Sequence, residues 1–171
     1  MALEVELKAP CGMNIEKKLV ALGAKFVREE TQDDVYLNHM LRDFKKTDEA
    51  LRIRGVNDQF FLTYKGPKLS NKTKTREEFE VPVGEEIKEI LTRLGFREGF
   101  FVSKTRRYYK LGDLSVCVDD VSNLGLYVEV ESKNVDDEGK VLDLMRKLGV
   151  PERAFTTKTY VELLEEKFRR T

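Results

Sequence analysis

The first residues that could do chemistry lie in the stretch LEVELK, at positions 3–8. Apolar residues occupy the odd positions, and Glu4, Glu6 and Lys8 occupy the even ones. This period of two predicts a β-strand with one apolar face and one charged face. Two carboxylates and an amine on one face could bind a cation and an anion together. Most charged strand faces point to water, so this strand alone does not identify a site.

Other predicted strands repeat the pattern, with acids gathered on some strands and bases on others. The bases on these faces are Lys8, Arg52, Arg54, Lys65, Lys74, Arg76, Lys104 and Arg106, and the acids are Glu4, Glu6, Glu78, Glu80, Asp119, Glu129 and Glu131. Salt-bridged sheet surfaces rarely separate the two signs in this way. We therefore expect the charged faces to converge on one site.

The hydrophobic periodicity and turn residues predict an α+β fold. Eight strands are expected at about 3–8, 25–38 (interrupted), 50–56, 59–65, 73–82, 99–110, 114–121 and 125–132, and helices at about 14–22, 85–94, 135–148 and 158–168. Turns at Asn57–Asp58 and Lys110–Asp113 make the neighbouring strands antiparallel. An eight-stranded antiparallel sheet can close into a barrel wide enough for one small ligand. We predict such a barrel, with helices packed on its outside, in a single domain spanning 1–171.

A weak internal repeat indicates which face of each strand points inward. Three Glu-x-Glu strands each precede a helix that ends in Leu-Gly, and Gly23, Gly95 and Gly149 suit the left-handed position after a helix. If these helices cover the apolar faces from outside, the charged faces point into the barrel. Many buried charges are tolerable only in a wet tunnel, where acids bind divalent cations and bases bind a polyanion. The pattern therefore predicts a site for a metal-bound polyphosphate.

Composition narrows the classes of partner. Lysine plus arginine (31) equals aspartate plus glutamate (31), so general affinity for nucleic acids or membrane surfaces is not expected. No apolar run approaches the ~20 residues of a membrane span, and no signal peptide is recognisable. Cys11 and Cys117 form no CxxC pair. We expect a cytoplasmic protein with no nucleic-acid or membrane partner, and the sequence allows a homodimer.

The order of the motifs carries a resemblance to a known family. EVELK, TDEALRIR, LTYKGP, KTREEFE, SKTRR and VDDVSNLGLYVEVE follow one another along the chain. In these motifs the sequence resembles the CYTH superfamily, the triphosphate tunnel metalloenzymes. The stretch QDDVYLNHMLRDFKKTDEALRIR resembles the class IV adenylyl cyclase (CyaB-type) branch in particular.

The resemblance implies a tunnel that binds a triphosphate such as ATP with Mg²⁺ or Mn²⁺. By position, the metal-binding acids would be Glu4, Glu6, Asp119, Glu129 and Glu131, and the phosphate-binding bases would be Lys8, Arg52, Arg54, Lys65, Arg76, Lys104 and Arg106. The catalytic centre would comprise Glu4, Glu6, Lys8 and Arg106. Glu78 and Glu80 would support the site, either at the metal or by orienting bases. His39, Cys117 and Tyr160 are expected to have packing or rim roles.

Three functions are compatible with this site. The resemblance favours an adenylyl cyclase that converts ATP to cyclic AMP and pyrophosphate. The first alternative is a triphosphatase acting on inorganic tripolyphosphate, thiamine triphosphate or a nucleoside triphosphate. The second alternative is a polyphosphate-binding module without catalysis. Five converging carboxylates argue against this last alternative, because a simple anion binder has no use for them.

Overall fold

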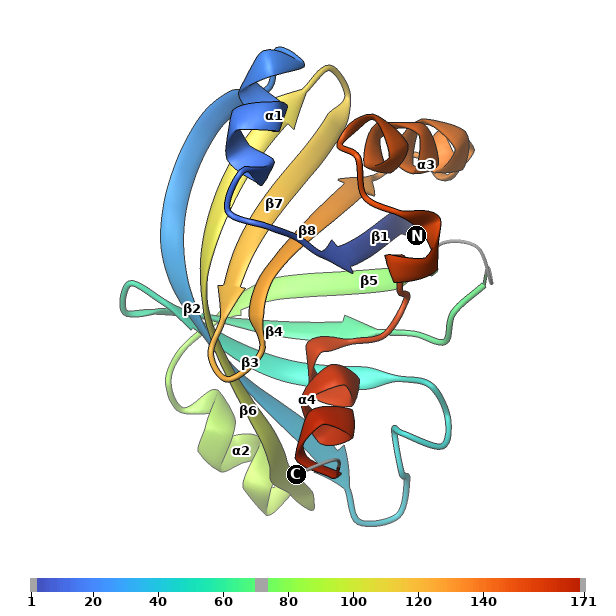
Figure 1. The fold of residues 1–171 in the computed structure, drawn as a ribbon. Helices are drawn as coiled ribbons and strands as arrows, with labels where there is room; N and C mark the ends of the chain where they lie inside the picture. Colours follow the sequence, from blue (N-terminus) through green and yellow to red (C-terminus); the bar gives the residue numbers. More distant parts are fainter. Residues whose placement is uncertain (1–2, 70–73, 170–171) are drawn as a thin grey trace.

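The fold is a closed, eight-stranded antiparallel barrel, as predicted (Figure 1). The computed structural model describes residues 3–69 and 74–169. The strands follow one another around the barrel in the order β1, β5, β4, β3, β2, β6, β7 and β8, and pairing of β8 with β1 closes it. Their bounds are β1 Leu3–Pro10, β2 Lys25–His39, β3 Ala50–Val56, β4 Gln59–Lys65, β5 Lys74–Val83, β6 Phe96–Leu111, β7 Leu114–Val121 and β8 Gly125–Ser132.

Two strands differ from the prediction because they pair with each other over almost their whole length. The segment 25–38, predicted as an interrupted strand, is one strand that continues to His39. Its pairing with β6 has register shifts at Phe26/Arg28 and Val35/Leu37. Strand β6 begins at Phe96 instead of 99, since Phe96 pairs with His39. The predicted strand residue 73 and the side chain of Lys74 lie outside the described part of the chain.

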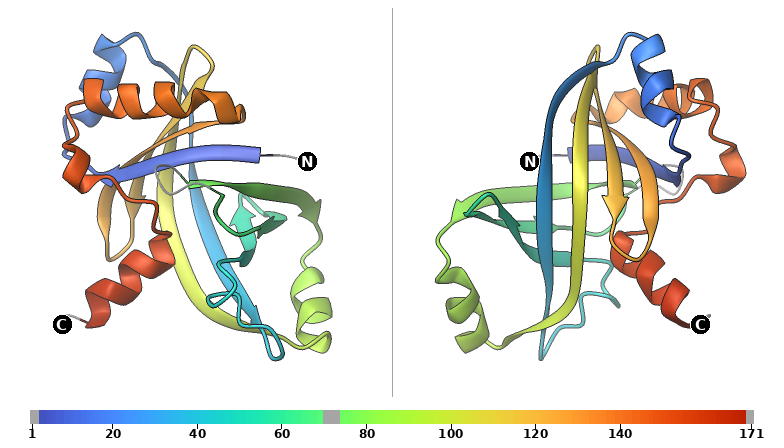
Figure 2. Two further views of the ribbon diagram at one scale, coloured as in Figure 1. Left: turned by 90° about the vertical axis from the view of Figure 1, so that its right-hand side faces the viewer. Right: turned by 60° about the vertical axis from the view of Figure 1, so that its left-hand side comes forward.

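The helices lie on the outside of the barrel (Figures 1 and 2). Their bounds are α1 Ile15–Ala21, α2 Ile87–Arg93, α3 Glu138–Lys147 and α4 Tyr160–Arg169, with single 3₁₀ turns at Val135–Asp137 and Glu152–Ala154. Helices α1 and α3 lie together at one end of the molecule, and Figure 2 shows α2 and α4 on opposite sides of the other end. Within the described residues, none of these helices has the length and apolar character needed to cross a bilayer.

The largest part of the core lies between β1, β7 and β8 and the helices α1 and α3. Val5 and Leu7 of β1 pack in one apolar cluster with Leu19 of α1 and Met145 of α3. Burying such side chains stabilises the fold by roughly 1.5–3 kcal/mol each. Because successive side chains of a strand point to opposite faces, this packing directs the even-numbered residues of β1 into the barrel.

Glycine ends the helices as the repeat predicted. Gly23, Gly95 and Gly149 have φ of 91°, 94° and 74°, a left-handed conformation that costs glycine little. At the end of α1, the Gly23 N–H donates to the Val20 carbonyl over 2.9 Å, and the Ala24 N–H donates to the Leu19 carbonyl over 3.0 Å. These bonds satisfy carbonyl groups that the last turn of a helix leaves unpaired, and they turn the chain into the next strand.

Candidate active site

The barrel encloses a cavity of about 270 Å³. Of the residues predicted for the site, those that line this cavity are Glu4, Glu6, Lys8, Arg52, Arg54, Lys65, Glu78, Glu80, Lys104, Arg106, Glu129 and Glu131. Arg76 and Asp119 do not line it. The structure therefore gathers nearly the whole predicted set in one place, while the role of each residue stays a prediction.

Strands β1 and β8 bring four carboxylates together. Their register places Glu6 directly opposite Glu131 and Lys8 directly opposite Glu129. Loss of contact with water, together with the negative charge of Glu129, raises the pKa of Glu131 to about 7. The pKa of Glu4 is also well above its ordinary value, through burial and a hydrogen bond with Glu78. This wall thus carries carboxyl groups that resist ionisation in the protein alone.

The chemistry of this wall fits Mg²⁺ or Mn²⁺. Among the described residues, no three acidic, histidine or cysteine side chains already converge as a preformed metal site. The donor set nevertheless consists of the hard carboxylate oxygens that these cations prefer. A bound cation would also favour the ionised forms of Glu4 and Glu131, which the surroundings now disfavour. Glu4, Glu6, Glu129 and Glu131 are the residues that would hold it.

Asp34, which sequence analysis did not identify, organises the basic wall. Its carboxylate is fully buried and accepts two hydrogen bonds of 2.7 Å from Arg54 and one of 3.0 Å from Lys104. The Nη1 atom of Arg52 lies 3.6 Å away. Although burial opposes ionisation, the positive charges of Arg52 and Lys104 and the bonds from Arg54 hold the pKa of Asp34 well below its usual range. One buried anion therefore fixes three cations of the tunnel.

Asp119 plays a similar part for Arg106. Its oxygens lie 2.7 and 2.6 Å from the Nε and Nη2 atoms of that guanidinium. The Tyr160 hydroxyl donates a further bond of 2.6 Å to Asp119, which is fully buried. Asp119 thus lies behind Arg106, with its oxygens already engaged by protein donors.

Tyr160 combines packing with this hydrogen bond. The side chain begins α4, is almost completely buried and lines the cavity. The Nζ atoms of Lys8 and Lys104 lie 4.8 and 5.6 Å from the centre of its ring. Cations at this distance are attracted to the face of an aromatic ring. The last helix therefore supplies part of the wall between two bases.

Several lining residues were not identified from the sequence. They are Arg28, Tyr36, Ala50, Thr63, Tyr108, Lys133 and Thr159, whereas Tyr160 was expected in a packing or rim role. In β2, Glu30, Gln32 and Asp34 are spaced by two, which places them on one face of the strand. Their neighbours Glu29, Thr31 and Asp33 are also polar and are exposed, so the sequence did not distinguish the inner face of this strand from its outer face.

We predict that Asp34→Asn destabilises the protein by about 3–5 kcal/mol, because it leaves buried cations without their counter-charge. The measurement is the free energy of unfolding from urea denaturation. Glu80→Gln is the control, since the Glu80 side chain is 41% exposed and lies 3.6 Å from Arg52. Equal losses in the two variants would contradict the central role of Asp34.

We predict that Glu131→Gln raises the melting temperature of the protein in a chelator at pH 8. The folded-state pKa of about 7 lies above the ordinary value of 4.5. Ionisation of this carboxyl therefore destabilises the folded protein by its full amount above pH 7 and not at all below about pH 4.5. The gain should disappear near pH 4, and Glu29→Gln on the outer face should show no gain. A lower melting temperature of Glu131→Gln at pH 8 would refute the argument.

Comparison with known proteins agrees with this geometry. A protein of Methanocaldococcus jannaschii, named "Putative adenylate cyclase MJ0240", is 38% identical over 169 residues, which cover 94% of this chain and 97% of that protein. The structure of the PH1819 protein from Pyrococcus horikoshii OT3 has a TM-score of 0.87 at 42% identity, covering 96% of this chain and 99% of the other.

A more distant structure shares the fold alone. It is described as "Putative adenylyl cyclase HpAC1" from Hippeastrum with a dominant triphosphatase activity, and it has a TM-score of 0.70 at 18% identity. It covers 98% of this chain and 96% of the other. The sequence pattern of the CYTH domain matches residues 2–160, nearly the whole chain, and the protein therefore belongs to the CYTH domain family.

Proposed function

We propose that the protein is a metal-dependent enzyme that binds ATP in the barrel and converts it to cyclic AMP and pyrophosphate. The observation that carries the proposal is the cavity inside the barrel, in which a wall of four carboxylates lies beside a wall of lysines and arginines. The similarity to the Methanocaldococcus jannaschii protein supports cyclisation in particular, since it extends over nearly the whole of both chains.

The basic wall is suited to a chain of phosphates. Lys8 lies 2.7 Å from Glu129, and Lys65 lies 2.7 Å from Glu78. A triphosphate would compete for these donors, because lysine and arginine form strong, charge-assisted hydrogen bonds with phosphate oxygens. Several bases along one cavity can hold the phosphates extended, which aligns the attacking oxygen, the phosphorus and the leaving oxygen.

The reaction requires charge neutralisation more than covalent participation by the protein. The ribose 3′ oxygen forms a bond to the α-phosphorus, the bond from that phosphorus to the bridging oxygen breaks, and pyrophosphate leaves with the electron pair. The hydroxyl proton passes to solvent. Lys8 and Arg106 neutralise the charge on the phosphoryl oxygens. Mg²⁺ or Mn²⁺ on the carboxylate wall would supply further positive charge and make the attacking oxygen more acidic.

Hydrolysis is the second candidate, because the wall does not select between nucleophiles. The same groups could hold the terminal phosphate of tripolyphosphate, thiamine triphosphate or a nucleotide beside a water molecule. The described residues that line the cavity include no histidine or cysteine, and His39 instead contacts the Leu94 carbonyl. The described lining therefore offers no histidine or cysteine that could take the proton of the ribose hydroxyl. A binding module without catalysis is less well supported, because it would not require the carboxylate wall.

We predict that ATP with Mg²⁺ or Mn²⁺ yields cyclic AMP and pyrophosphate in equal amounts. Chromatographic separation of the products measures this directly. ADP and orthophosphate without cyclic AMP would instead identify a triphosphatase. Faster release of phosphate from tripolyphosphate than from ATP would point to the same conclusion.

We predict that a chelator abolishes turnover and that Mg²⁺ or Mn²⁺ restores it. Glu6→Gln preserves the shape of the side chain but removes an anionic ligand, so kcat should fall by roughly two or more orders of magnitude. Glu29→Gln is the matched control, because Glu29 is 53% exposed and lies beside Arg107 rather than in the cavity. Full activity in the chelator would exclude the metal-dependent mechanism.

A further inference from the structure

We propose that a second cavity, next to the tunnel, binds the organic part of the substrate, an uncharged, flat heterocycle such as the base of a nucleoside triphosphate. This inference rests on the proposed binding of a triphosphate in the tunnel. The second cavity has a volume of about 260 Å³ and shares Tyr36, Ala50 and Thr159 with the first. A ligand could therefore extend from one cavity into the other.

The walls of the second cavity suit a ring rather than another phosphate. Leu37, Phe44 and Leu51 belong to one apolar cluster, and Val161 of α4 lines the cavity with them. The charged residues of its lining are mainly acidic: Asp43, Asp48, Glu49, Glu162 and Glu165 against Lys45 and Arg76. An acidic, apolar pocket disfavours phosphate but accepts an uncharged aromatic group.

Arg76 supplies the polar group that could orient the ring. It was predicted to bind phosphate, but its side chain lines the second cavity and not the tunnel. The residue is 3% exposed, and its Nε atom has no hydrogen-bond partner among the described residues. A buried donor without a partner is costly, and a turn of the guanidinium toward an acceptor on a bound ring would remove that cost. The planar guanidinium can also stack on an aromatic ring.

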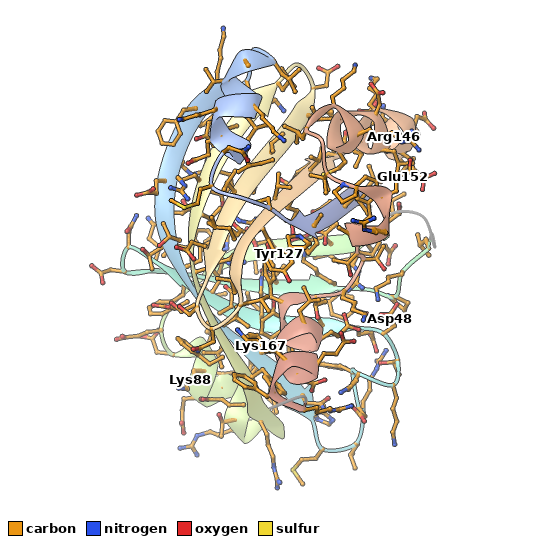
Figure 3. The ribbon with its side chains drawn as sticks, in the orientation of Figure 1. Asp48, Lys88, Tyr127, Arg146, Glu152 and Lys167 are labelled. Carbon is orange, nitrogen blue, oxygen red and sulfur yellow. The ribbon has the colours of Figure 1, made fainter. Side chains whose placement is uncertain are left out.

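The neighbouring loop holds Arg76 at the cavity. Asp48, labelled in Figure 3, lies between β2 and β3, and its Oδ1 atom is 3.6 Å from Nη2 of Arg76. Its other oxygen accepts a hydrogen bond of 2.8 Å from the Lys68 N–H. Asp48 has a φ of 55°, a conformation that non-glycine residues adopt at a cost. Such strain persists where the surroundings fix the backbone, and it is common at ligand sites.

The inference gives a triphosphate ester an advantage over inorganic tripolyphosphate. Both would fill the tunnel, but only the ester would also occupy the second cavity and meet Arg76. Removing the guanidinium should therefore weaken binding of ATP and leave binding of tripolyphosphate unchanged. A residue that binds phosphate would affect both ligands equally.

The test measures the rise in melting temperature caused by ATP and by tripolyphosphate, in a chelator so that metal-dependent turnover does not interfere. Arg76→Met keeps the length of the side chain but removes its donors. Its apparent Kd for ATP should rise about tenfold or more, and its Kd for tripolyphosphate less than about twofold.

Arg93→Met is the control, because Arg93 of α2 is 78% exposed and lines neither cavity. Val161→Trp fills the second cavity from α4 and should likewise weaken binding of ATP but not of tripolyphosphate. This variant replaces Arg76→Met in the test if Arg76→Met does not fold.

The outcomes separate this inference from the proposed function. Equal weakening of both ligands by Arg76→Met would make Arg76 a phosphate ligand and overturn the second cavity, while the proposed function would stand. Tripolyphosphate binding to the unaltered protein as tightly as ATP would also overturn it. If neither ligand binds the unaltered protein, either in the chelator or with Mg²⁺ or Mn²⁺ added, the proposed function fails together with the inference.

Discussion

The structure depends on keeping many ionised groups inside a closed barrel. Moving an unpaired ion out of water costs several kcal/mol, so each buried charge needs a partner. Lys8 meets this need with Nζ 3.2 Å from Glu6 and 2.7 Å from Glu129. Although burial alone would lower the pKa of Lys8, the negative charges of Glu129 and Glu6 raise it above its ordinary value. Mutual neutralisation lets the charged wall exist before a ligand arrives, and the same groups remain available to a ligand that offers stronger partners.

This constraint explains why the helices are on the outside. A slip of one residue in β1 would turn Val5 and Leu7 into the tunnel and Glu4 and Glu6 under α1 and α3. The slip would lose both the apolar packing and the pairing of charges. Closure of the barrel removes any free sheet edge at which the register could drift. Apolar packing outside and ion pairing inside therefore specify the same alignment of strands.

The sequence predicts those parts of the site where the two faces of a strand differ. Arg52 and Arg54 alternate with Leu51 and Ile53, so their shared face could be recognised. Asp34 could not be, because β2 has polar residues on both faces and its outer face is exposed there. Arg76 shows a further limit, since alternation assigns a residue to a face but not the direction of a long side chain. The barrel was predictable because its apolar faces required covering helices.

The buried acids of the barrel have two physical states, and strand register together with side-chain length determines which state each acid adopts. Asp34 lies directly opposite Arg54 in the pairing of β2 with β3, and Asp119 directly opposite Arg106 in that of β6 with β7. A short aspartate reaches the arginine across the strand pair and is held by it. The longer glutamates of β1 and β8 reach the cavity, where Glu131 lies opposite another acid and its pKa rises to about 7. Strand register thus separates carboxylates that position arginines from those suited to a divalent cation.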